Sequence, residues 1–113
     1  MEDLKQEIGP ACLLLRAIGN PVRLSILCAL DEEEKSVGQL AAHLGLGQSN
    51  LSQHLARLHQ AGLVTRRRHR VTVYYGLAGE RAVPLMRTLR FLCCDAPASH
   101  AAPAHLVSRP GTV

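Results

Sequence analysis

The clearest pattern along the chain is a leucine repeat near its middle. Leu51, Leu55 and Leu58 recur at intervals of four and three residues, which is the apolar stripe of a helix that packs on one side. Hydrogen-bonding side chains fill the positions between them, and glycines flank the repeat at both ends. The pattern predicts an amphipathic helix from about Gln48 to Gln60, with one face in the core and the other in solvent.

Three more helices are predicted before this one. Proline suits the first turn of a helix, so the first is expected to start or kink at Pro10, and Asn20-Pro21 is a cap followed by a first-turn proline. Ser36 can cap the third helix, and Gly45 can end it. The charged run between the second and third helices, Asp31 to Lys35, is interpreted as a solvated connector. The predicted helices cover residues 10–18, 21–30 and 37–44.

The second half of the chain predicts a hairpin and one more helix. Residues 63–65 and 71–75 are rich in β-branched and aromatic side chains, and a basic run lies between them at the expected tip. Apolar spacing predicts a last helix from about Gly79 to Cys94. The expected fold is mainly α with a small β-hairpin, in the order α-α-α-α-β-β-α. This is a winged helix-turn-helix, whose motif is the pair of helices 37–44 and 48–60.

Composition adds limits to this fold. The 113 residues fit a single domain, and we expect an N-terminal extension (1–9), a domain (10–94) and a disordered tail (95–113). The net charge of +4 favours an acidic partner. No segment approaches the roughly twenty apolar residues of a membrane span, and the acidic start does not resemble a signal peptide. We therefore expect a cytoplasmic protein with no membrane partner.

The residue types on two of these elements favour double-stranded DNA as that partner. Uncharged amide and hydroxyl groups on the exposed face of helix 48–60 can hydrogen-bond to base edges, and arginines can bind phosphates or enter a minor groove. A basic hairpin is often only a solvated loop, and a histidine on a helix can equally pack, but the two elements together favour DNA. The candidate contacts are Gln48, Ser49, Asn50, Ser52, Gln53, His54, Arg57, Arg66, Arg67, Arg68 and Arg70.

Three stretches together resemble the ArsR/SmtB repressors. They are Asn20-Pro21-Val22-Arg23-Leu24-x-Ile26-Leu27, the run from Gln48 to Val64, and Tyr74-Tyr75-x-Leu77. The resemblance implies a homodimer, joined through its first and last helices, that represses a nearby operon and leaves its operator when an inducer binds. Two positions depart from the family pattern: Gly47 stands where relatives commonly have serine, and Pro10 shortens or bends the first helix.

Family members sense different signals, so each known site was compared with these residues. The cysteines of an arsenic-type site are absent at Ser36 and Gly38, and the last helix has no histidine for a zinc-type site. Cys28 and Cys94 resemble instead the persulfide-sensing branch. That resemblance implies that reactive sulfur species oxidise the two thiols to a disulfide or polysulfide bridge. Arg90 lies four residues before Cys94, where its charge would favour a thiolate, whereas the partial negative charge of the helix C-terminus would disfavour one.

Several alternatives remain open at this point. Cys93 is an alternate partner for Cys28, although it and Cys12 also fit packed helix residues. Arsenite or antimonite could instead bind Cys93, Cys94 and a third thiol. A thiol enzyme would need a CxxC motif or cofactor loop that the sequence lacks, and a protein-interaction module is the third alternative. We predict a repressor that is not an enzyme, without cofactor or resident metal, whose partners are DNA, a second copy and a sulfur inducer.

Overall fold

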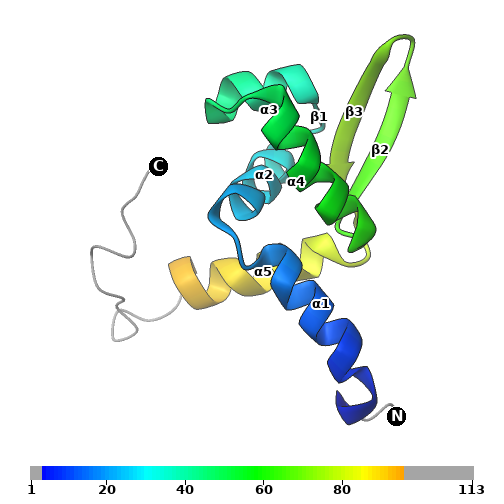
Figure 1. The fold of residues 1–113 in the computed structure, drawn as a ribbon. Helices are drawn as coiled ribbons and strands as arrows, with labels where there is room; N and C mark the ends of the chain where they lie inside the picture. Colours follow the sequence, from blue (N-terminus) through cyan, green and yellow to red (C-terminus); the bar gives the residue numbers. More distant parts are fainter. Residues whose placement is uncertain (1–3, 96–113) are drawn as a thin grey trace.

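The computed structural model describes residues 4–95, which are mainly helical with one small sheet (Figure 1). The predicted winged helix-turn-helix order is confirmed: two helices precede the motif, and the hairpin and a last helix follow it. In chain order the elements are a 3-10 turn (Leu4–Glu7), α1 (Ile8–Ile18), α2 (Pro21–Glu32), β1 (Lys35–Ser36), α3 (Val37–Leu44), α4 (Gln48–Gln60), β2 (Val64–His69), β3 (Thr72–Leu77), α5 (Ala82–Arg90) and a π-helical turn (Phe91–Asp95). The tail predicted from residue 95 lies, beyond Asp95, outside the described residues.

The first helix begins earlier than the sequence suggested. α1 starts at Ile8 and continues directly from the 3-10 turn, so part of the expected N-terminal extension is helical. The predicted start at Pro10 is therefore wrong. Proline is tolerated inside this first turn because the first backbone N–H groups of a helix have no partner within it.

The predicted caps of the next helices are confirmed. The Asn20 side chain accepts a hydrogen bond from the Arg23 backbone N–H at 3.0 Å, with Pro21 in the first turn of α2. Ser36 and Gln39 form a reciprocal capping box at the start of α3. Gly45 ends α3 with φ +69°, a left-handed conformation that glycine adopts without steric cost. These caps place α3 and α4 as predicted.

The charged connector after α2 is not simply solvated, which corrects the sequence interpretation. Its last residue belongs to a short strand, β1, that pairs with β3. The Lys35 side chain is buried, and its ammonium group donates a 2.8 Å hydrogen bond to the Ala29 carbonyl near the end of α2. A buried lysine needs such a partner because an unpaired charge away from water is costly. The connector thus closes the end of α2 against the sheet.

The sheet has the strand order β1-β3-β2 and is antiparallel throughout. The hairpin is confirmed, but its basic residues lie along β2 rather than at the tip. Arg66, Arg67 and Arg68 face Tyr75, Tyr74 and Val73 of β3 in register. Only Arg70 lies in the turn, with φ +61°. Arginine is long and its stem pairs well with a neighbouring aromatic ring, so β2 extends through the basic run.

The last helix is shorter than predicted. α5 begins at Ala82, whose N–H donates to the Ala78 carbonyl at 2.8 Å, and it gives way to the π-helical turn after Arg90. The predicted start at Gly79 is wrong because residues 78–81 form a turn that leads from β3 into the helix. The predicted end near Cys94 holds only if the π-helical turn is counted.

The core lies where the leucine repeat meets α2. Leu51, Leu55 and Leu58 are fully buried, as the repeat predicted, against Ile26 and Leu27. One face of α4 is thus held rigidly and the other is presented to solvent. In the part of the chain that the structure describes, no single helix is long and apolar enough to cross a membrane. The segments Leu4–Ile18 and Pro21–Glu32 reach the length and apolar composition of a membrane span only when they are taken together, and the chain bends by 85° between them.

Candidate nucleic-acid interface and cysteine pair

The outer face of α4 carries the predicted base-reading groups in an accessible form. Six candidates are exposed, and their side chains make no hydrogen bond within residues 4–95: Gln48, Ser49, Asn50, Ser52, Gln53 and Arg57. The buried leucines fix the rotation of the helix about its axis, so these groups form one polar surface. Gly47 at the N-cap provides no side-chain hydrogen bond, which leaves the first N–H groups of α4 open to an anionic partner.

His54 lies differently from the other candidates on α4. It is half-buried, and its Nδ1 atom lies 3.2 Å from Nη1 of Arg23 on α2. Burial lowers the pKa of His54, and the positive charges of Arg23 and Arg57 lower it further. A guanidinium group can only donate, so Nδ1 accepts, and the proton of the neutral ring sits on Nε2. The expectation that His54 could equally pack fits this geometry.

Arg23 is a functional residue that sequence reasoning missed. Its side chain is buried, and besides His54 it donates hydrogen bonds to the carbonyls of Ala17 and Arg16 at the end of α1. One guanidinium group thereby joins α1, α2 and α4, the helix that carries the predicted base-reading groups. The available signal was the charged residue inside the otherwise apolar start of α2, at the third position after the Asn20 cap.

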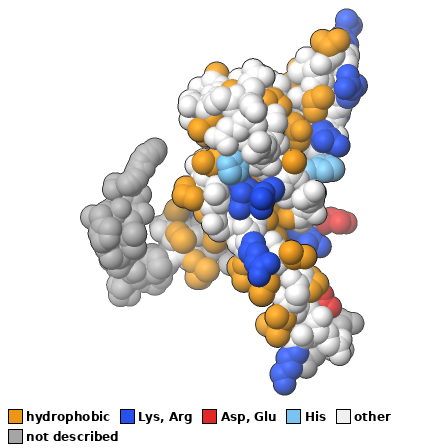
Figure 2. Space-filling view, viewed as in Figure 1, with side chains coloured by type: hydrophobic (Ala, Val, Ile, Leu, Met, Phe, Trp, Pro, Cys, Tyr) orange, Lys and Arg blue, Asp and Glu red, His pale blue; other side chains and the backbone are white. Residues whose placement is uncertain are grey.

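The arginines of the hairpin fall into two groups. Arg67 makes a two-point ion pair with Glu34 of the connector, at 3.1 and 2.7 Å, and its guanidinium carbon lies 5.0 Å from the centre of the Tyr74 ring. This pairing lowers the pKa of Glu34. Arg66, Arg68 and Arg70 are exposed and make no ion pair within the described residues, so they are free to bind phosphates. Figure 2 shows Lys and Arg side chains along the hairpin and over the middle of the same face.

Cys28 lies on α2, and Cys94 lies in the turn just after α5, a helix that contacts α2. Partial loss of hydration, which disfavours the charged thiolate, raises the pKa of the Cys28 thiol. Asp31 raises it further, Arg90 lowers it, and a charge on Cys94 raises it. A charge on Cys94 thus acts on Cys28 across the contact between α2 and α5. Arg90 forms an ion pair with Asp31, and its charge also acts on Cys28.

The other two cysteines are not buried in this chain. Cys12 and Cys93 are exposed, as are Cys28 and Cys94, and none of the four forms a disulfide. The interpretation of Cys12 and Cys93 as packed residues is therefore wrong for the described part of a single chain. Among residues 4–95, no three His, Cys, Asp or Glu side chains are grouped as a metal site would require.

Comparison with known proteins identifies the class. Residues 20–66, from the start of α2 into β2, match the family described as bacterial regulatory protein, arsR family. The transcriptional activator HlyU of Vibrio cholerae is 41% identical over 96 residues, which are 85% of this chain and 89% of that protein. The chain belongs to the ArsR family. The biofilm growth-associated repressor of Xylella fastidiosa, another relative, is 37% identical over 82% of each protein.

Solved structures agree with the family assignment. Reduced HlyU from Vibrio cholerae has a TM-score of 0.74 and 40% identity, covering 83% of this chain and 99% of that one. A homodimeric winged helix-turn-helix domain from Mycobacterium bovis, described as a possible ArsR-family regulator, has a TM-score of 0.72 and 30% identity over 80% and 84% of the two chains. Membership of the ArsR family confirms the predicted winged helix-turn-helix fold, a DNA-binding regulator and a protein that is not an enzyme.

Proposed function

We propose that this ArsR-family protein is a cytoplasmic homodimeric repressor. It binds operator DNA through α4 and the hairpin, and it is released when reactive sulfur species oxidise Cys28 and Cys94 to a disulfide or polysulfide bridge. The sulfur-sensing part is supported by the contact between α2 and α5 and by the electrostatic effect of Cys94 on Cys28, two residues that lie 66 positions apart in the sequence. We propose repression rather than activation because the Xylella relative is named a repressor, although HlyU is named an activator.

A second copy would cover an apolar surface that the single chain leaves open. Ile8, Leu15, Phe91 and Leu92 are 54%, 61%, 59% and 47% exposed, and they lie on α1 and on the turn that follows α5. Large apolar side chains that stay exposed in a single chain mark interaction surfaces. These are the first and last helices, and the Mycobacterium bovis relative is described as homodimeric.

The DNA-binding part assigns different roles to the two sets of side chains. Gln53 and its polar neighbours on α4 read base edges, and the free arginines of the hairpin bind phosphates. On DNA from upstream of the gene, Gln53→Ala should weaken specific binding and leave random DNA unaffected. Arg68→Ala should weaken binding to both and reduce the salt slope by about one. Equal losses on both DNAs for both variants would contradict this division.

The chemistry of release needs only the two thiols and a persulfide, RSSH. A cysteine thiolate attacks the outer sulfur of RSSH, which transfers that sulfur and releases RSH. The other thiolate then attacks the sulfur atom bonded to carbon in the new cysteine persulfide, which closes the disulfide and releases hydrosulfide. The two thiols are oxidised, the persulfide is reduced, and the products are one disulfide, RSH and hydrogen sulfide. Retention of the transferred sulfur, with further persulfide, gives the longer bridge.

The test is release from operator DNA after treatment with a defined persulfide, followed by fluorescence anisotropy. The wild type should dissociate and regain binding with dithiothreitol, whereas Cys28→Ser and Cys94→Ser should stay bound. Cys93→Ser is the matched control, since it removes the adjacent thiol and should dissociate like the wild type. If Cys28→Ser is released as readily as the wild type, the proposed bridge is wrong. If Cys28→Ser and Cys93→Ser both resist release and Cys94→Ser does not, Cys93 is the partner of Cys28.

Mass spectrometry on the treated protein separates the inducers. A persulfide inducer leaves a cross-linked pair of peptides, containing Cys28 and Cys94, with no added atom or with added sulfur. Arsenite bound through Cys93, Cys94 and a further thiol would add one arsenic atom and would release the operator without any sulfur donor. Release by arsenite alone would replace the persulfide proposal with that alternative.

A further inference from the structure

We propose a second ligand site, separate from the cysteines, for a small organic anion with an apolar body. The site is a pocket of about 470 Å³ between α1 and the last turns of α4. Four arginines line it, namely Arg16, Arg23, Arg57 and Arg81, and no acidic side chain does. Its volume lies within the range of small-molecule sites, roughly 300–1,000 Å³.

The charge in this pocket is not neutralised by the protein. Arg16, Arg57 and Arg81 are exposed, and their guanidinium groups make no hydrogen bond or ion pair within residues 4–95. Only Arg23 is committed, to the carbonyls of α1 and to His54. Several like charges in a concave site focus a positive potential and attract anions. Three arginines are thus available to bind a carboxylate or phosphate in two-point fashion.

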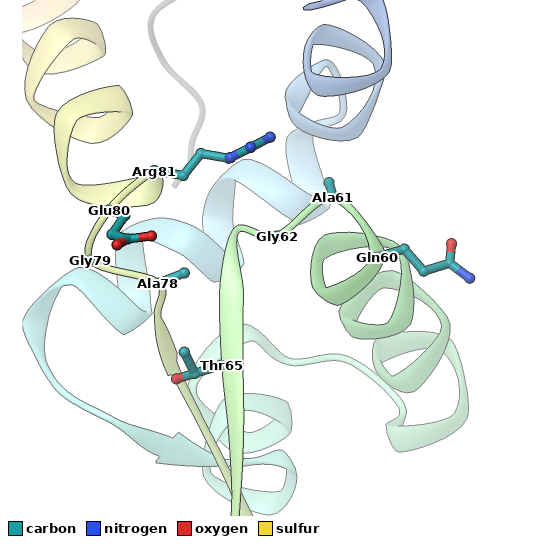
Figure 3. A pocket seen from close by; sticks show the side chains of 8 residues that line it. All are labelled: Gln60, Ala61, Gly62, Thr65, Ala78, Gly79, Glu80 and Arg81. Atoms are coloured by element: carbon teal, nitrogen blue, oxygen red, sulfur yellow. The ribbon is translucent and has the colours of Figure 1, made fainter. Parts of the chain in front are cut away.

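Arg81 forms one wall of the pocket and comes from a distant part of the chain. It lies at the turn before α5, and Figure 3 shows its side chain extending toward Ala61 at the end of α4. The adjacent hollow drawn in Figure 3 shares Arg81 but also contains Glu80. That carboxylate does not line the arginine pocket. The two hollows therefore differ in charge, and only the pocket beside α1 is purely cationic.

The side of the pocket that α1 lines, here called its floor, is apolar, and this distinguishes the proposed ligand from a DNA phosphate. Pro10, Leu13 and Leu14 of α1 line it, and Leu13 is 63% exposed in this structure. DNA backbone would meet the arginines at the rim and leave this floor uncovered. A carboxylate or phosphate monoester attached to an alkyl or aryl group would cover both parts. Leu13 also lies on the opposite side of α1 from Ile8 and Leu15, so the proposed dimer surface leaves the pocket open.

The experiment uses three anionic probes, octanoate, benzoate and phenyl phosphate, with 1-octanol as the uncharged counterpart. Binding to the full-length protein is measured by calorimetry, and the site is mapped by NMR of the arginine Nε–H groups. We expect saturable binding of at least one anion below about 1 mM, with shifts at Arg16, Arg57 and Arg81. The Arg16→Gln/Arg57→Gln double variant should weaken it about tenfold or more. Leu13→Glu, which places a carboxylate at the floor, should abolish it.

Two control variants show whether the anion binds in the arginine pocket or elsewhere on the protein. Arg87→Gln removes an exposed charge from α5 outside the pocket and should leave anion binding unchanged. Cys28→Ser should also bind the anion like the wild type, so failure of the sulfur mechanism would not affect this result. The proposal is overturned if no anion binds saturably, if 1-octanol binds as tightly as octanoate, or if Arg87→Gln weakens binding as much as the double variant.

Discussion

Replacement of Arg23 by methionine tests how α4, the proposed DNA-facing helix, is held against α1 and α2. The side chain is only 9% exposed, and its guanidinium group bonds to two carbonyls of α1 and to Nδ1 of His54. Methionine keeps most of the length and apolar volume but donates nothing. The variant therefore leaves the carbonyls at the end of α1 without these donors, and it removes the hydrogen bond between α2 and His54 of α4.

The expected loss of stability follows from the bonds removed. A hydrogen bond to a charged group contributes about 1.5–3 kcal/mol, so the two carbonyl bonds together give roughly 3–6 kcal/mol. The carbonyl of Arg16 is only partly buried and can bind water instead, and the buried charge itself carries a desolvation cost. Both effects favour the low end of the range. We expect Arg23→Met to lower the free energy of unfolding by about 3 kcal/mol.

Urea unfolding monitored by circular dichroism measures this loss, and NMR of the imidazole C–H groups measures the second effect. The pKa of His54 should rise in Arg23→Met because a nearby positive charge is gone. Arg23→Lys keeps the charge but not the planar fork, so it should lose stability while the pKa of His54 stays lowered. The exposed Arg16→Met is the matched control and should change little. A loss below about 1 kcal/mol, or an unchanged His54 pKa, would refute the assigned role.

Three further predictions follow from the same structure. Because the pKa of His54 is lowered below its ordinary value of 6.5, the unfolded chain binds more protons than the folded protein as pH falls below that value. Stability should therefore decline from pH 7.5 to 5.5, and His54→Gln should remove that part of the decline in urea midpoints. Asp31→Asn should lower the pKa of Cys28 and speed its alkylation by iodoacetamide at pH 7.5, as followed by mass spectrometry, since a negative neighbour is removed. Leu55→Ala, at a position with no exposed surface, should cost about 2–5 kcal/mol in urea unfolding with an unchanged m-value.

Local signals predicted the elements that position the site. The leucine repeat placed α4 and its buried face because helical periodicity is a property of neighbouring residues. The Asn20 cap, the Ser36 capping box and the Gly45 terminus were readable for the same reason, since each acts within four residues. The exposed polar face of α4 could be predicted from the same repeat, because burial of the leucines turns the opposite face of the helix to solvent.

Long-range pairing could not be predicted in the same way. His54 meets Arg23 across 31 positions and Arg67 meets Glu34 across 33, and nothing local to either residue specifies its partner. For Arg67 the consequence is practical. On sequence alone the hairpin arginines share one expected role, but the structure ties this one to Glu34 and Tyr74 and leaves its neighbours free.

The pairing of the charged connector, Asp31 to Lys35, is also long-range and could not be predicted locally. Its ion pairs lie beside both parts of the proposed function, the thiol pair and the hairpin. Asp31 pairs with Arg90 beside Cys28 and Cys94, and three residues later Glu34 holds Arg67 of the hairpin. A bridge between the thiols would act on the junction of α2 and α5 that the first of these ion pairs also joins. The second ion pair, between Glu34 and Arg67, begins only three residues after Asp31. Within the four residues from Asp31 to Glu34, one ion pair therefore lies at the junction of α2 and α5 and another at the hairpin.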